Sequence, residues 1–104
     1  MDHSLLKKDH NLVTLRGYIE HPPEQSQYKG RPVVVFGLST RMGEDQLIVH
    51  HRILTVGVVA AQAFRLKAKT RAFVTGEIVT DTWTDLDGTT HTHQSILADI
   101  IAQI

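Results

Sequence analysis

The sequence predicts an all-β domain with one helix, and three observations lead to this class. Apolar and polar residues alternate in five separate segments, as they do in strands that bury one face. A helical period replaces this alternation once, between the third and fourth segments. Turn residues such as Asp87-Gly88 join neighbouring segments over short distances. With 104 residues, the chain suits a single domain of this kind.

The first two strands are expected at 11–19 and 33–40. The first alternates between apolar and polar positions and ends at His21-Pro22-Pro23, because proline cannot donate a hydrogen bond to a sheet ladder. A polar loop is expected to run from these prolines through Gly30. The second strand should turn three side chains inward: Val34, Phe36 and Leu38.

The third strand and the helix follow in turn. A short turn at 41–45 leads into a strand over 47–56, which is rich in β-branched residues. After Gly57, apolar residues recur at i, i+4 and i+7, and alanine is frequent. This pattern predicts a helix of about three turns. Its inward face should carry Val59, Ala63 and Leu66.

The last two strands are expected at 71–83 and 89–104, joined by a turn at 85–88. Gly76 lies in the middle of the first of these, where a bend or bulge is expected. Five strands with a helix between the third and the fourth is the layout of the five-stranded OB-fold barrel, in which closure removes the sheet edges. We therefore expect a flexible arm over 1–10 and one OB-fold domain over 11–104.

Composition excludes several classes of protein. Lys and Arg number 11 and so do Asp and Glu, so the net charge is zero and a strongly basic nucleic-acid binder is excluded. The chain has no cysteine, which excludes a disulfide scaffold and a cysteine-based zinc site. No apolar run approaches the length of about 20 residues that a membrane span needs. The first eight residues lack a signal-peptide core, so a cytoplasmic, nucleoid-associated protein is expected.

Charge is distributed unevenly along the chain. Every lysine and arginine lies in 1–71, where the balance is +5, whereas 72–104 holds five acidic residues and no basic one. Such asymmetry can mark a face that meets an anionic partner. Alternatively, the two parts interleave in space and the asymmetry averages out.

Four short motifs follow one another in order along the chain. They are Asn11-x-x-x-Leu15-x-Gly17, Phe36-Gly37-Leu38-Ser39-Thr40, His51-Arg52-Ile53 followed by Gly57, and Gly76-Glu77-Ile78-Val79-Thr80-Asp81-Thr82-Trp83 followed by Asp87-Gly88. In this order and spacing they resemble the strands of bacterial single-stranded DNA-binding proteins, of which primosomal replication protein B is a close relative. The resemblance covers residues from about 10 to 104. It implies an OB-fold that binds single-stranded DNA in replication, recombination or repair.

The sequence also departs from that family. The family stacks DNA bases on several aromatic side chains, whereas three corresponding positions here hold His50, Val56 and Glu44. The family's flexible acidic tail, which recruits other proteins, has no counterpart before Ile104. These departures favour a second hypothesis, an OB-fold protein-interaction module with weak DNA binding, such as a primosome-like protein or a diverged paralogue. Replication proteins would then be its partners.

The candidate DNA-binding residues combine rings for stacking with cations for phosphates. Trp83 is the expected stacking residue, with a wall or oligomer contact as the alternative. The other candidates face outward on a strand or lie in a loop, so they could contact bases or phosphates. These are Phe73, Tyr18, Arg16, Arg52, His50, Arg41 and Lys29.

A second set of outward-facing side chains is apolar or neutral and needs a cover. It consists of Leu12, Thr14, Ile48, Leu54 and Val56. In the resembled family, the matching surfaces form dimers and tetramers, so a homodimer or homotetramer is expected. The alternative is a monomer in which the helix and loops cover these residues.

No arrangement of residues suggests catalysis. No serine lies in a nucleophile elbow, and no glycine run could cradle a phosphate. His91 and His93 have a spacing that a metal could bridge, but no third ligand accompanies them. We therefore expect a protein that is not an enzyme and that has no cofactor and no metal.

Overall fold

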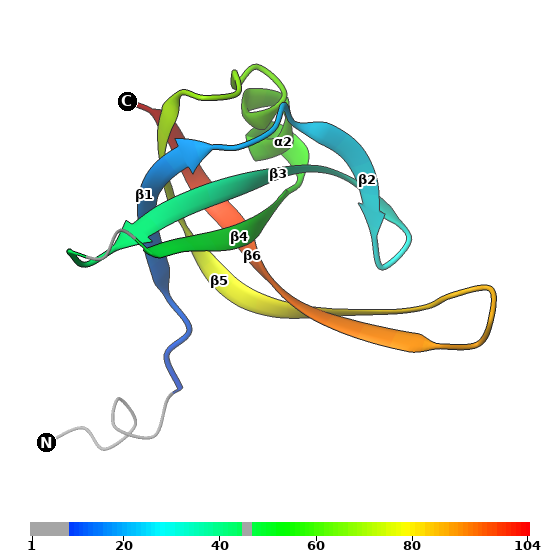
Figure 1. The fold of residues 1–104 in the computed structure, drawn as a ribbon. Coiled ribbons are helices and arrows are strands. Elements are labelled where there is room, and N and C mark those ends of the chain that lie inside the picture. Colours follow the sequence, from blue (N-terminus) through cyan, green and yellow to red (C-terminus); the bar gives the residue numbers. More distant parts are fainter. Residues whose placement is uncertain (1–8, 45–46) are drawn as a thin grey trace, which may run out of the picture.

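The computed structural model describes residues 9–44 and 47–104, apart from the side chains of Asp81 and Trp83. Most of the predicted arm, 1–8, therefore lies outside the described residues. Within these described residues, six strands and one helix follow one another, arranged as Figure 1 shows. They are β1 (Val13–Ile19), β2 (Glu24–Tyr28), β3 (Arg31–Met42), β4 (Leu47–Thr55), α2 (Gly57–Ala63), β5 (Arg71–Thr84) and β6 (Thr90–Gln103).

Five of the strands close into a ring. β1 pairs with β5, β5 with β6, β6 with β4, β4 with β3, and β3 returns to β1 through Tyr18 and Ile19. All of these pairings are antiparallel except β4–β6, which is parallel. The prediction of a mostly β chain with one helix is therefore confirmed, and the order of the five ring strands closes the sheet.

The strand outside the ring is β2. Its residues were expected to form a polar loop, and that prediction is wrong. β2 pairs antiparallel with β3 over its whole length, beside the ring. The two residues between these strands, Lys29 and Gly30, both have positive φ, at 50° and 76°. Such a pair is typical of the tight turn in a two-residue β-hairpin. The strand escapes a search for alternation because its side chains are polar on both faces.

The helix is shorter than predicted. α2 spans seven residues instead of about three turns, and turns follow it as far as Lys69, where φ is 66°. Its N-cap, Val56, offers no side-chain hydrogen bond, so little stabilises a longer helix locally. Ala63 and Leu66 are nevertheless buried as predicted, and α2 covers one end of the ring (Figure 1). In the described part of the chain, no helix is long and apolar enough to cross a membrane.

The core fills the inside of the ring, and two glycines allow the strands to approach there. A Cβ at Gly17 would lie 2.1 Å from the Ser39 carbonyl oxygen, where β1 crosses β3. A Cβ at Gly76 would lie 2.2 Å from the Leu97 carbonyl oxygen. The β5–β6 register shifts between Thr75 and Gly76, so the predicted bulge is confirmed. The buried cluster is Ile19, Val34, Phe36, Leu38, Ile53, Ala63, Leu66, Ala72, Val74, Ile96 and Ala98.

Candidate functional site

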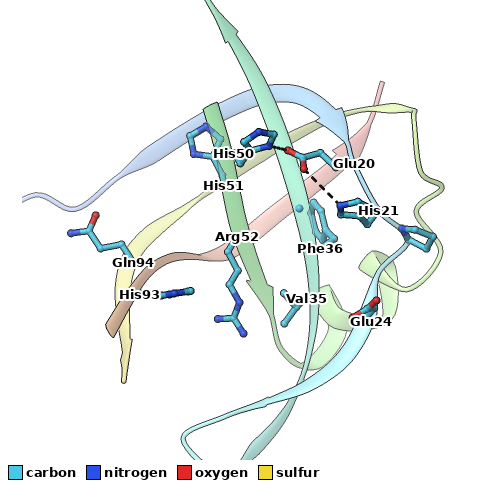
Figure 2. Close-up of a pocket in the computed structure, with 12 residues that line it drawn as sticks. Glu20, His21, Glu24, Val35, Phe36, His50, His51, Arg52, His93 and Gln94 are labelled. Carbon is cyan, nitrogen blue, oxygen red and sulfur yellow. Dashed lines mark hydrogen bonds and ion pairs between the residues drawn. The ribbon is translucent and has the colours of Figure 1, made fainter. Parts of the chain in front are cut away.

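A groove crosses the outer face of β3 and β4 (Figure 2), between the β2–β3 hairpin and the β5–β6 hairpin. It consists of three adjoining hollows with volumes of about 470, 200 and 630 Å³. The first reaches the segment after β1, the second reaches Ile78 on β5, and the third lies between Lys29 and Thr82. Arg52 lines all three, so it marks the centre of the groove.

Arg52 is half-buried and held by its neighbours. It lies opposite Gly37 on β3, where the missing side chain leaves room on the groove face. Its Nη1 donates a hydrogen bond to Oγ of Ser95, a buried residue on β6, over 3.2 Å. The guanidinium group presents its N–H donors in a planar fork, a geometry that matches a phosphate group.

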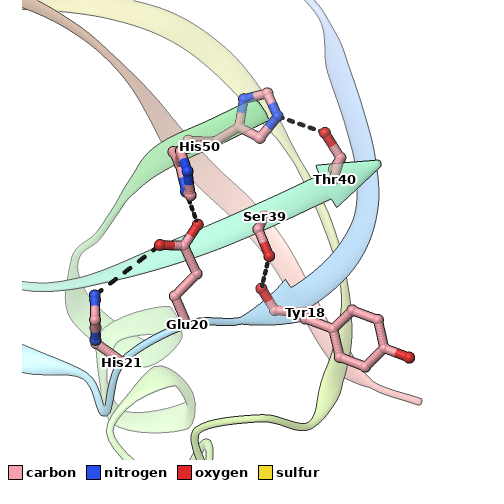
Figure 3. Close-up of polar contacts among 7 residues, drawn as sticks. Tyr18, Glu20, His21, Ser39, Thr40 and His50 are labelled. Carbon is pink, nitrogen blue, oxygen red and sulfur yellow. Dashed lines mark hydrogen bonds and ion pairs between the residues drawn. The ribbon is translucent and has the colours of Figure 1, made fainter. Parts of the chain in front are cut away.

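Glu20 connects two histidines at one end of the groove (Figure 3). It follows β1 directly, and its backbone N–H donates to the Gly37 carbonyl oxygen over 2.9 Å. Its carboxylate accepts a hydrogen bond from Nδ1 of His50 and lies 4.0 Å from Nε2 of His21. The side chains of His50 and His21 are 68% and 77% exposed, so both imidazoles are open to a ligand.

His51 differs from its neighbour on β4. Its Nε2 forms a hydrogen bond of 2.9 Å with Oγ1 of Thr40 on β3. Burial lowers the pKa of His51 below its ordinary value of 6.5, and the positive charge of a protonated His50 acts in the same direction, whereas Glu20 opposes it.

The two hairpins that flank the groove touch each other. The hydroxyl of Tyr28, at the end of β2, donates to the Thr80 carbonyl oxygen on β5 over 3.4 Å. The Lys29 ammonium lies 5.3 Å from the centroid of the Tyr28 ring, which is a cation–π distance. Sequence reasoning missed Tyr28 as a site residue, although an aromatic ring before a Lys-Gly turn was a signal that could have found it.

The structure brings three of the eight predicted DNA-binding residues into the groove: Arg52, His50 and Lys29. Arg41 is exposed near the end of β3, opposite Ile48, and is not among the lining residues of the three hollows. Trp83 lies on β5 opposite His91, and its side chain is outside the described part of the structure.

The other three predicted residues share a different surface, the outer face of β1 and β5. Arg16 pairs in register with Phe73, and Tyr18 pairs with Arg71. The Arg71 guanidinium lies 4.9 Å from the centroid of the Tyr18 ring. This group of cations and rings lies away from the groove, so the predicted site divides into two surfaces.

One predicted oligomer contact is wrong. Leu54 is completely buried, because β4 has Val35 of β3 on one side of it and Leu97 of β6 on the other. The other four residues of that set are exposed but do not form one patch. Leu12 and Val56 line one hollow, whereas Ile48 lies at the far end of β4 and Thr14 on the outer face of β1.

Comparison with known proteins adds no further assignment. No family model matches the chain, and no curated protein matches its sequence significantly. The groove itself offers cations and imidazoles, with the Tyr28 ring beside it, a set that can bind an extended polyanion.

Proposed function

We propose that this chain is a non-catalytic single-stranded DNA-binding protein with an OB-fold, acting in replication, recombination or repair. The ring order β1-β3-β4-β6-β5 and the helix between the third and fourth ring strands fit the OB-fold layout. Proteins of that fold bind oligonucleotides on the face of ring strands 2 and 3, between the loop that joins strands 1 and 2 and the loop that joins strands 4 and 5. In this chain these correspond to β3, β4 and the two hairpins that flank the groove.

One observation carries the proposal: Arg52 lies where the three hollows of that face meet. A cation at the centre of an open groove suits the phosphate backbone of a single strand, which supplies a sequence-independent attraction. Lys29 adds a second cation at the β2–β3 turn.

Aromatic side chains contribute less than in the resembled family. Stacking provides about 1–3 kcal/mol per base, and the groove has Tyr28 beside it, with Trp83 carried by the β5–β6 hairpin. We therefore expect binding in the micromolar range, dominated by charge and weakened by salt.

The test is titration of a fluorescently labelled oligo-dT strand, followed by anisotropy at several salt concentrations. Arg52→Ala should weaken binding and reduce the slope of log K against log[salt] by about 0.7, the value for one phosphate contact on a single strand. Arg52→Lys, which keeps the charge, should retain the slope. Arg65→Ala removes an exposed arginine after α2, outside the groove, and serves as the matched control.

Equal losses in Arg52→Ala and Arg65→Ala would contradict the proposal, because general charge would then explain the binding. Absence of binding at low salt, with the fold intact, would favour the protein-interaction module instead.

One observation supports that second candidate: three apolar side chains at the β3–β4 hairpin are mostly exposed. Met42, Leu47 and Ile48 are 59%, 65% and 52% exposed.

We also propose self-association into a homodimer or homotetramer. From the predicted set, Leu12 and Val56 are exposed apolar residues that line one hollow together, so we place the contact there. Light scattering of the purified protein would give its mass, and Leu12→Lys should shift that mass towards the monomer if this hollow is an interface.

A further inference from the structure

The groove holds an unusual number of imidazoles. Four histidines line the hollow that adjoins the segment after β1, and they come from three different parts of the chain (Figure 2). They are His21, His50, His51 and His93. None of them is needed for the role of Arg52 described above, so the cluster calls for its own explanation.

The fixed charges around these histidines nearly cancel. Arg52 on β4 and Lys29 at the β2–β3 turn are the cations along the groove, and Glu20 and Glu24 are the carboxylates among its described side chains. With neutral imidazoles, attraction of a polyanion to the groove therefore depends on Arg52 and Lys29, and the two carboxylates weaken it. Each protonated imidazole adds one positive charge and presents N–H donors on both ring nitrogens.

We propose that His21, His50 and His93 form a phosphate-binding site that engages single-stranded DNA when the imidazoles are protonated, and that Glu20 competes with phosphate for His21 and His50. This inference rests on the proposed function. The Glu20 carboxylate already shows how an anionic oxygen binds there, since it accepts from His50 and approaches His21 to 4.0 Å.

His93 approaches the same space from β6. Its side chain and that of Arg52 point into the region between β4 and β6 (Figure 2). The two residues share the first and the third of the hollows described above. A strand that contacts Arg52 therefore passes His93 on one side and His50 on the other. His51 is not part of this site, because its ring is bonded to Thr40 and burial disfavours its charged form.

Histidine is the side chain whose charge responds to pH near neutrality, so binding is compared between about pH 8 and about pH 5.5. We expect the dissociation constant for oligo-dT to fall about tenfold or more over that interval. The slope of log K against log[salt] should steepen by about 0.7 for each histidine that contacts a phosphate.

The experiment measures oligo-dT binding by anisotropy at both pH values and several salt concentrations, with circular dichroism confirming that each protein is folded. Oligo-dT is the probe because thymine does not titrate in this range. In the triple variant His21→Gln, His50→Gln and His93→Gln, the gain in affinity from about pH 8 to about pH 5.5, measured against the variant's own affinity at about pH 8, should be mostly lost. The control His10→Gln removes an exposed histidine before β1, outside the groove, and should keep the full gain.

Glu20→Gln gives an independent readout, since it should strengthen binding severalfold at both pH values by removing the competing carboxylate. Binding that does not change with pH, or a triple variant that keeps the gain, would overturn this inference and leave the proposed function standing. Absence of binding by the wild type at every pH and at low salt would overturn the proposed function itself. The two failures are therefore distinguishable.

Discussion

The two halves of β4 have the same kind of sequence and opposite environments. Its first four residues, Leu47 to His50, are exposed on both faces, whereas its last three, Ile53 to Thr55, are completely buried. Both halves pair with β3. The parallel pairing with β6 is confined to Ile53 and Leu54, where the ring closes.

Burial along this strand therefore follows the number of neighbouring strands and not the alternation of side chains. Where β6 lies beside β4, both faces are covered and the strand belongs to the core. Where β6 diverges with the β5–β6 hairpin, β4 belongs to a two-stranded ribbon with β3, and even Leu47 and Ile48 are exposed. The groove lies at the transition between these halves, at His50, His51 and Arg52.

The largest difference between the two halves should appear when an apolar side chain is removed from each. Leu54→Ala should lower the free energy of unfolding by about 2–5 kcal/mol, because it deletes a buried side chain and leaves a cavity. Ile48→Ala should change it by less than about 0.5 kcal/mol, because that side chain is half exposed already. Urea unfolding of both variants measures these changes. Similar losses in the two would show that the first half of β4 is buried in solution, for example in an oligomer.

A somewhat smaller effect is expected from adding a side chain where the ring is tightest. Gly76→Ala should lose about 1–3 kcal/mol of stability, because its Cβ would lie 2.2 Å from the Leu97 carbonyl oxygen and the β5–β6 backbones would have to separate. Gly37→Ala is the control on the open groove face. Its Cβ would meet Glu20 side-chain atoms at 3.7 Å, which is ordinary contact. Thermal unfolding would compare the two, and an unchanged midpoint in Gly76→Ala would contradict the close approach.

Hydrogen bonds should show the same contrast at a lower magnitude. Oγ1 of buried Thr55 donates to the Val34 carbonyl oxygen over 2.8 Å, so Thr55→Val should cost about 1–2 kcal/mol. In the β5–β6 hairpin, exposed Thr84 bonds with Thr90 over 3.3 Å, and Thr84→Val should cost less than about 0.5 kcal/mol. Urea unfolding again gives both values. Equal costs would mean that the hairpin is as well shielded from water as the ring.

The sequence was informative where local periodicity and burial agree. Val34, Phe36 and Leu38 alternate on a strand with neighbours on both sides, and they are buried as predicted. Leu54 alternates in the same manner but lies where the parallel pairing with β6 covers it, and that pairing joins segments more than 40 residues apart. Such a long-range contact leaves no local signal, so the prediction of an outward Leu54 failed.

The candidate site was predictable by residue type more than by location. Arg52 was selected because a cation alternates outward beside a histidine, and it lines the groove; its contact with DNA stays a prediction. Tyr18 and Arg16 were selected by the same reasoning, yet they lie on the outer face of β1 and β5. Glu20 and His93 were not selected, because β4, β6 and the segment after β1 meet in the groove only once the ring has closed, and the sequence carries no local signal of that meeting. Asn11 is another such case: its side-chain amide pairs with the Ile78 backbone in both directions, at 2.8 Å, across 67 residues.

The smallest predicted effect concerns His51, at the boundary between the two halves of β4. Because burial lowers the pKa of His51 below 6.5, the folded protein binds fewer protons than the unfolded chain as pH falls below that value. The contribution of His51 to stability is thus fully present above about pH 6.5 and is lost as pH falls through the lower pKa of the folded state.

This dependence can be measured as the difference in unfolding free energy between the wild type and His51→Gln, in urea, from about pH 8 to about pH 5. The difference should shift against the wild type as pH falls, because glutamine does not titrate. Thr40→Val removes the hydrogen bond of 2.9 Å to His51 but keeps the histidine, so its own pH profile should still follow that of the wild type. A difference that stays constant with pH would mean that His51 is solvated in the folded protein. The exposed part of β4 would then run from Leu47 through His51 instead of ending at His50.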